Sequence, residues 1–159
     1  MSLLVAAAIA LSPRPALADE GAFSVGVPIE LDVVGFVVGP RPELLWRPGS
    51  AGSVSHVRVA LGALFGPEYG YFPAALGWRG RFRHGARVQP FVGAGAELQT
   101  VVVLDAAPYW RLGWYLEGGV DVRLIGAHHV TLQVAPDLSV GNHLGVGLST
   151  RIGWRFDLD

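Results

Sequence analysis

Strict alternation between apolar and polar residues is the feature that most constrains how this chain can fold. Over residues 110–124 every charged side chain occupies an odd position, while the even positions hold apolar residues or glycine. Successive side chains of a β-strand point to opposite faces of its sheet, so this segment predicts a strand with one apolar and one polar face. Residues 129–140 and 143–158 repeat the pattern.

The remaining strands follow the same rule less strictly. Residues 56–65, 71–83 and 88–104 each alternate, and residues 25–46 alternate with a change of phase at Val34-Gly35. A tight turn or a bulge would produce such a change, and we interpret it as a turn, which gives eight strands. Short connections rich in Gly, Pro and Asn predict an antiparallel meander, and a meander of this size closes into a barrel.

The composition is unusual for a water-soluble domain. The chain of 159 residues is 51% hydrophobic and 16% charged, whereas soluble proteins average about 25% charged residues. No stretch approaches the roughly 18 consecutive apolar residues that a transmembrane helix needs. The formal net charge of -1 lacks the basic excess of a nucleic-acid-binding protein, so no nucleic-acid partner is predicted.

The N-terminus has the layout of a secretory signal peptide. An apolar run over residues 3–11 is followed by Ala16-Leu17-Ala18, a small-x-small sequence typical of a cleavage site. We predict a signal peptide at residues 1–18, cleavage after Ala18 and one exported domain at residues 19–159, although no Lys or Arg precedes the run. An ordinary apolar segment of the domain is the alternative. The chain has no cysteine, so an exported protein would fold without disulfides.

The alternation of apolar and polar residues, a period of two, does not by itself show which face of the strands points into the barrel. The polar face combines many glycines with a nearly balanced set of arginines and carboxylates, as a narrow enclosed interior requires. We predict that this face lines the lumen and that its charged residues form a network that plugs it. That predicted network consists of Glu30, Asp32, Glu43, Arg47, Arg58, Arg79, Arg81, Glu97, Arg111, Glu117, Asp121, Arg123, Asp137, Arg151 and Arg155. Arg41 and Asp157 share the same face.

Aromatic residues of the apolar face gather near the strand ends, as expected at two lipid–water interfaces. The two groups are Trp46, Phe82, Trp154 and Phe156 at the end that holds the termini, and Phe36, Phe65, Phe72, Trp110 and Trp114 at the other. The sequence therefore predicts an all-β protein, a single eight-stranded antiparallel up-and-down transmembrane β-barrel, in preference to a soluble lipid-binding barrel.

With these features the chain resembles the small outer-membrane β-barrel proteins of Gram-negative bacteria, which share the architecture of OmpA and OmpX. Its C-terminal segment looks like the family's assembly signal at Arg151, Gly153, Phe156 and Leu158, although Asp159 follows where the family usually ends on an aromatic residue. The resemblance implies recognition by the barrel-assembly machinery, contact with outer-membrane lipid and location in the bacterial outer membrane. The short connections argue against a receptor or adhesin.

An eight-stranded lumen is filled by side chains, so we expect a structural barrel of unassigned role, monomeric, without enzymatic activity, cofactor or metal. The alternative is a lipid-modifying enzyme of the lipid A deacylase kind. Its candidate catalytic residues would be His129, Asp137, Ser139 and His143, all on the polar face of the last two strands. Their spacing does not match the His-x-Ser-Asn run that we associate with the deacylase, because Val130 and Thr131 follow His129.

Overall fold

The computed structural model describes residues 22–32, 36–48, 54–82, 86–141 and 144–158. The predicted signal peptide, Val34-Gly35 and His143 lie outside these ranges. Ten β-strands form one sheet: β1 (Ala22–Asp32), β2 (Val37–Pro40), β3 (Glu43–Arg47), β4 (Ser55–Leu61), β5 (Leu64–Phe65), β6 (Tyr69–Arg81), β7 (Val88–Val103), β8 (Tyr109–Arg123), β9 (His128–Val140) and β10 (Leu144–Leu158).

Two of the eight barrel strands are each interrupted once. β2 and β3 pair with β1 in one continuous register, and β4 and β5 likewise continue each other. Pro40 and Pro42 have no N–H group to donate, which explains the first interruption. Backbone bonds bridge both gaps, from Arg41 N to Pro28 O at 2.9 Å and from Ala63 N to Pro40 O at 3.1 Å. The prediction of eight strands is therefore confirmed.

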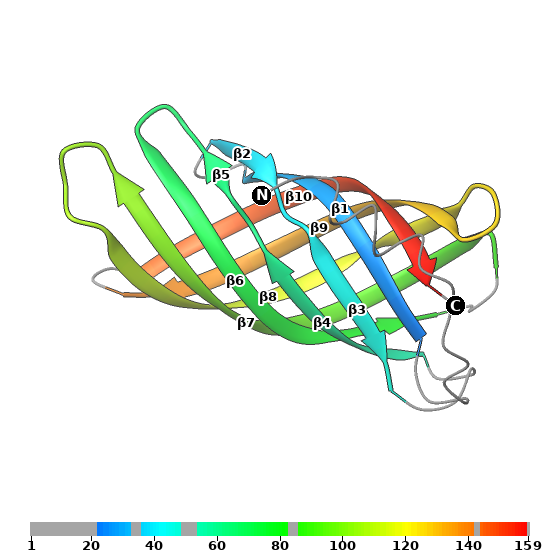
Figure 1. Ribbon diagram of the computed structural model, residues 1–159. Helices are drawn as coiled ribbons and strands as arrows, with labels where there is room; N and C mark the ends of the chain where they lie inside the picture. The colour runs from blue at the N-terminus through cyan, green and yellow to red at the C-terminus, as the bar shows by residue number, and fades with distance from the viewer. Residues whose placement is uncertain (1–21, 33–35, 49–53, 83–85, 142–143, 159) are drawn as a thin grey trace.

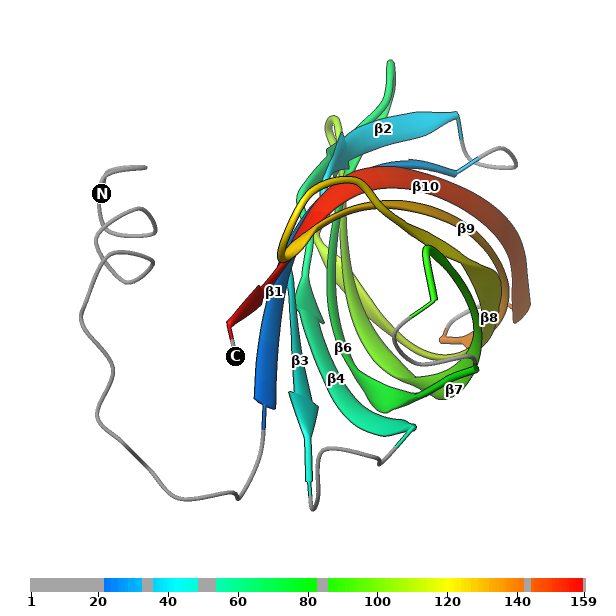
Figure 2. The ribbon, with the colours of Figure 1, turned by 90° about the vertical axis from the view of Figure 1, so that its right-hand side faces the viewer.

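Neighbouring strands are antiparallel, and pairing between β1 and β10 closes the barrel. Figure 2 looks along the barrel and shows β10 lying beside β1. Starting at Ala22 on β1, one can move from each residue to its partner on the next strand, passing Arg79 on β6 and Ser149 on β10. This path around the barrel returns to β1 at Asp32, so the strands are staggered by ten residues over one full circuit. A closed barrel with such a stagger has strands tilted by roughly 35–45° to its axis. Figure 1 shows the strands running obliquely along the barrel.

The phase change near Val34-Gly35 accompanies a reversal of the chain. β1 and β2 are antiparallel, with Asp32 opposite Val37, so the chain turns back between these two residues. Phe36, beside β2, has a positive φ of 53°, which is rare for an aromatic residue outside a turn. This reversal agrees with the interpretation as a turn, although Val34-Gly35 themselves lie outside the described residues.

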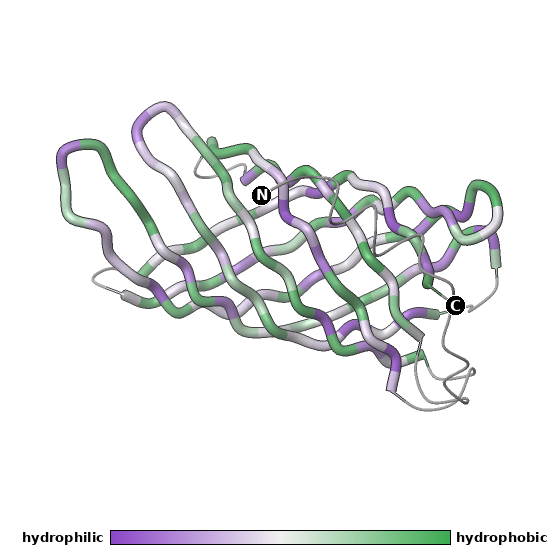
Figure 3. The backbone as a smooth tube through the Cα atoms, viewed as in Figure 1, coloured by the Kyte–Doolittle hydropathy of each residue, from purple (hydrophilic) through white to green (hydrophobic). Residues whose placement is uncertain are grey.

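The two faces of the sheet have the predicted environments. The large apolar side chains of the strands are exposed on the outer face, while most arginines and carboxylates of the polar face are buried in the lumen. Figure 3 shows the resulting alternation of hydropathy along each strand. The exposed aromatic residues include Phe23, Trp46, Phe82 and Trp154 near the termini, and Phe36, Phe65, Phe72 and Trp110 near the other end. Trp78 and Trp114 are also exposed but lie nearer the middle of β6 and β8, and Phe156 is only partly exposed. A soluble barrel with an apolar interior was therefore the wrong alternative.

Among the described residues, no helix is long and apolar enough to cross a membrane.

A charge on the outward face near the middle of β8 should destabilise the barrel in a bilayer. Leu116 lies at mid-strand and is 63% exposed. We expect Leu116→Arg to lower the free energy of unfolding from phospholipid vesicles by about 2–4 kcal/mol.

The matched control is Leu104→Arg, because Leu104 is 72% exposed but lies beyond the end of β7. Its cost should be about 0–1 kcal/mol, as at a membrane interface. Equal effects of the two substitutions would contradict the assignment of the outer face.

Candidate functional site

The lumen is filled by long charged side chains that face small residues on neighbouring strands. Arg58, Arg79 and Arg155 are fully buried. Glycines leave room for their partners: a Cβ atom at Gly93 would lie 2.6 Å from Glu117 Oε1, and one at Gly77 would collide with the Tyr115 hydroxyl. Each buried charge needs a partner, because taking an isolated ion out of water costs several kcal/mol.

The central cluster joins Arg58 and Arg79 to Glu43 and Glu117. Arg79 donates from Nε to Glu117 Oε1 at 2.7 Å and from Nη1 to Glu43 Oε1 at 3.0 Å. Arg58 donates from Nε to Glu43 Oε2 at 2.7 Å, and its Nε lies 3.7 Å from Glu117 Oε2. Two positive charges therefore meet two negative charges in the middle of the lumen.

Neutral side chains complete the central cluster from the far wall of the lumen. Arg79 on β6 donates from Nη2 to Gln133 Oε1 on β9 at 3.0 Å, and Gln133 donates to Glu117 Oε2 at 2.8 Å. Arg58 on β4 donates from Nη1 to the Tyr115 hydroxyl on β8 at 3.0 Å. These bonds reach across the barrel, so the cluster obstructs the lumen.

The far cluster lies on the side of the central cluster away from the termini. Arg41 and Arg151 both contact Glu30, with Arg41 Nη1 and Arg151 Nε each 2.8 Å from Glu30 Oε2. Arg41 also pairs with Glu97, which accepts a hydrogen bond from the Tyr71 hydroxyl at 2.5 Å. This cluster again contains two arginines and two carboxylates.

The terminal cluster lies near the chain termini and pairs Arg81 and Arg155 with Asp121 and Asp157. Arg81 Nε lies 3.3 Å from Asp121 Oδ2, to which Arg155 also binds. Arg155 Nε lies 3.3 Å from Asp157 Oδ1, and His129 Nε2 lies 2.9 Å from Asp157 Oδ2. The three clusters thus each match two arginines with two carboxylates.

Not every residue of the predicted network belongs to a cluster. The structure places Asp32, Arg47, Arg111, Arg123 and Asp137 at the ends of the strands, where they are less buried than the cluster residues. Period two identifies the face of a residue but not its height along the barrel axis, so the sequence could not separate these end residues from the clusters.

Sequence reasoning also left residues out of the network. Arg41 shares the polar face but was not included, although it is buried and pairs with two glutamates. Tyr71, Tyr115 and Gln133 also lie outside the predicted network, because they carry no formal charge and the network was predicted from opposite charges. Their position on the polar face is the sequence feature that indicates that they point into the lumen.

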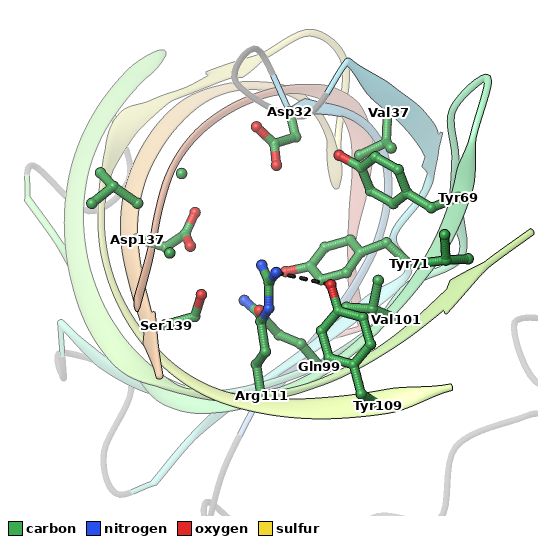
Figure 4. A pocket seen from close by; sticks show the side chains of 14 residues that line it. Asp32, Val37, Tyr69, Tyr71, Gln99, Val101, Tyr109, Arg111, Asp137 and Ser139 are labelled. Carbon is green, nitrogen blue, oxygen red and sulfur yellow. Dashed lines mark hydrogen bonds between the residues drawn. The ribbon is translucent and has the colours of Figure 1, made fainter. Parts of the chain in front are cut away.

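A cavity of about 250 Å³ lies at the end opposite the termini, beyond the far cluster. Its lining includes Asp32, Asp137, Ser139, Arg111 and three tyrosines. Figure 4 shows Asp137 and Ser139 on one side of this cavity, Tyr69, Tyr71 and Tyr109 on the other, and Asp32 between the two sides. Arg111 donates from Nη2 to the Tyr109 hydroxyl at 2.9 Å.

Among the candidate catalytic residues of a lipid-modifying enzyme, the structure separates His129 from Asp137 and Ser139. His143 lies outside the described residues. His129 is buried near the termini beside Asp157, whereas Asp137 and Ser139 line the cavity at the other end. Ten residues of β9 separate His129 from Ser139, a span of roughly 33 Å along the strand. A nucleophile and its base must come within hydrogen-bond reach, so grouping His129 with Ser139 was wrong. The described residues also contain no group of His, Cys, Asp and Glu suited to a metal ion.

No protein-family model and no curated protein matches the chain. Among solved structures, the Neisserial surface protein NspA is 14% identical with a TM-score of 0.61, covering 86% of this chain and 94% of its own. OprG from Pseudomonas aeruginosa is 15% identical with a TM-score of 0.54, covering 88% and 97%. A de novo designed transmembrane β-barrel is 14% identical with a TM-score of 0.58, covering 93% and 100%.

The chain has the fold of the outer-membrane β-barrels. The likeness extends to a designed chain and holds at low sequence identity, so it rests on strand number, closure and the placement of apolar residues outside. It carries no information about ligands or activity.

Removing one charge from the central cluster should destabilise the barrel. Glu117 is 4% exposed and contacts both Arg58 and Arg79. Glu117→Gln keeps the shape but leaves two arginines facing one glutamate, so we expect the free energy of unfolding in vesicles to fall by about 3 kcal/mol.

Glu68→Gln serves as the control, because Glu68 is exposed in the connection between β5 and β6. It should change stability by about 0.5 kcal/mol or less. A Glu117→Gln barrel as stable as the control would show that the central cluster contributes little.

Proposed function

We propose that the protein is an integral barrel of the bacterial outer membrane whose lumen is closed to diffusion by the three salt-bridged clusters. The observation that carries this proposal is the contrast between the two faces of one sheet. Aliphatic side chains between two belts of exposed aromatic residues suit lipid, whereas the buried lumen holds matched arginines and carboxylates.

The clusters support a closed barrel rather than a pore. Eight strands leave an interior just wide enough for side chains. Arg41, Arg58 and Arg79 each bind partners three strands away, so their guanidinium groups cross the space that a solute would need. The proposed role is therefore that of a structural membrane barrel, without transport through its centre.

Export and assembly belong to the same proposal. Residues 1–18 would direct the chain out of the cytoplasm and be removed after Ala18. The segment from Arg151 to Leu158 would then be recognised by the barrel-assembly machinery. In the folded barrel this segment pairs with β1, where Leu158 lies opposite Phe23, so it forms one side of the closing seam. We propose that the assembled barrel is a monomer in contact with outer-membrane lipid.

The orientation follows from the shared position of the termini. Phe23 lies opposite Leu158 where β1 pairs with β10, so Ala22 and Leu158 lie at the same end of the barrel. If assembly begins on the periplasmic side and the termini stay in the periplasm, only the short connections at the opposite end of the barrel have to cross the bilayer. We therefore place the termini in the periplasm and the connection between β7 and β8 outside the cell.

Location and orientation can be tested together, because the chain has no cysteine. Ala107→Cys introduces a thiol into the exposed β7–β8 connection, and Arg87→Cys introduces one at the exposed start of β7. Both proteins should fractionate with the outer membrane and migrate differently on gels before and after heating. A membrane-impermeant maleimide should label intact cells of the Ala107→Cys variant and not those of the Arg87→Cys variant.

Labelling of both variants after the outer membrane is permeabilised provides the control for thiol accessibility. Recovery of the folded protein in the soluble fraction would overturn the membrane assignment. Labelling of Arg87→Cys alone on intact cells would reverse the orientation.

A further inference from the structure

The cavity at the far end of the barrel is lined unevenly by charge. Two carboxylates, from Asp32 and Asp137, face it together with one guanidinium, from Arg111. Arg111 is held on the aromatic side, where it donates to the Tyr109 hydroxyl and stacks on that ring with 5.1 Å to the centroid. The charged groups that line this cavity therefore leave a net negative charge.

Ser139 and Asp137 point into the cavity, and within the described ranges neither polar group contacts a side chain other than those that line this space. The Ser139 side chain belongs to a residue only 3% exposed, and it has no hydrogen bond with any residue that the structure describes. Asp137 forms no ion pair or hydrogen bond with the described part of the chain. The Ser139 hydroxyl is the more unusual of the two, because Ser139 is 3% exposed and the polar groups of buried residues are normally satisfied, whereas Asp137 is only partly buried.

Two glycines of β10 create the space in front of these groups. A Cβ atom at Gly145 would lie 2.6 Å from Ser139 Oγ and 3.3 Å from Arg111 Nη1, and one at Gly147 would collide with the Asp137 carboxylate. Any larger residue at either position would fill the cavity. The absence of side chains at these two glycines therefore keeps the space in front of Asp137 and Ser139 open.

The charged residues around the mouth of the cavity are negative, as is the net charge of its lining. Glu68 and Asp105 lie in the β5–β6 and β7–β8 connections, two of the connections at this end of the barrel. The described arginines outside the clusters, apart from Arg111, lie at the opposite end: Arg47, Arg87 and Arg123. This separation draws cations toward the cavity and disfavours anions.

We propose that this cavity binds one small organic cation that carries a guanidinium or primary ammonium group. The carboxylates of Asp32 and Asp137 and the hydroxyl oxygen of Ser139 accept hydrogen bonds from the cationic group. The rings of Tyr69 and Tyr71 offer a surface for its carbon chain. At about 250 Å³ the cavity is smaller than the pockets of roughly 300–1,000 Å³ that hold drug-sized ligands, so the ligand is small.

The lining favours an organic cation over a metal ion. Hard divalent cations prefer six or more oxygen ligands, mostly carboxylates and carbonyls. Here two carboxylates share the space with three phenol rings and a guanidinium. Apolar ring surface beside a pair of carboxylates fits a ligand with a charged head and a short carbon chain.

The test compares three ligands of nearly the same shape and different charge. Purified, folded barrel in detergent is titrated with n-butylguanidinium, with the neutral n-butylurea and with the anionic pentanoate, and binding is measured by calorimetry. Chemical shifts of backbone amides locate the site. We expect n-butylguanidinium to bind and to perturb residues near Ser139 and Gly145, and the other two to bind at least about tenfold more weakly.

Asp137→Asn should weaken n-butylguanidinium binding by about tenfold or more, because it removes one charged acceptor. The matched control is Asp105→Asn, which makes the same chemical change at an exposed position outside the cavity and should alter binding less than about twofold. If Asp137→Asn does not fold, Asp32→Asn is the second variant of the same kind.

Equal binding of n-butylurea, preferential binding of pentanoate or no binding at all would overturn the proposal. So would equal effects of Asp137→Asn and Asp105→Asn. The inference rests on the proposed closure of the lumen, since the far cluster forms the floor of the cavity. A barrel that folds and reaches the outer membrane but binds no cation would refute this inference alone, whereas a protein found in the soluble fraction would refute the proposed function.

Discussion

The pairing of buried arginines with carboxylates is the interaction on which the rest of this structure depends. A lumen enclosed by eight strands holds little water, so an arginine pointing into it must find an acceptor among the facing side chains. Each of the three clusters meets this requirement with two arginines and two carboxylates, as the central set of Arg58, Arg79, Glu43 and Glu117 illustrates. The proposed closure of the lumen follows from this pairing, and glycines such as Gly93 leave the room that the paired side chains occupy.

The outer face obeys the opposite constraint. Lipid offers no hydrogen bonds, so backbone groups must pair within the sheet and side chains must be apolar. Closure of β1 on β10 satisfies the first demand, and the outward aliphatic band satisfies the second. The same alternation therefore explains why the chain is unusually apolar for a soluble domain.

Much of the fold could be predicted from alternation, because a period of two fixes both the strands and their faces. The contacts inside the lumen could not be predicted, because they depend on the stagger between strands. Arg41 meets Glu97 across 56 positions of sequence, and Arg79 meets Glu117 across 38. His129 and Ser139 share a face in the sequence pattern, but they are ten positions apart on one strand and therefore lie at opposite ends of β9.

The central claim is that the salt-bridged clusters close the lumen, and ion conductance across planar bilayers tests it most directly. The wild-type barrel should give no steady conductance, nor should the control Glu68→Ala/Arg87→Ala, which removes one acid and one base from exposed positions. Arg79→Ala/Glu117→Ala removes a whole ion pair and its volume from the central cluster, and should open stepwise conductance. A wild-type barrel that conducts as well as this double variant would contradict the account.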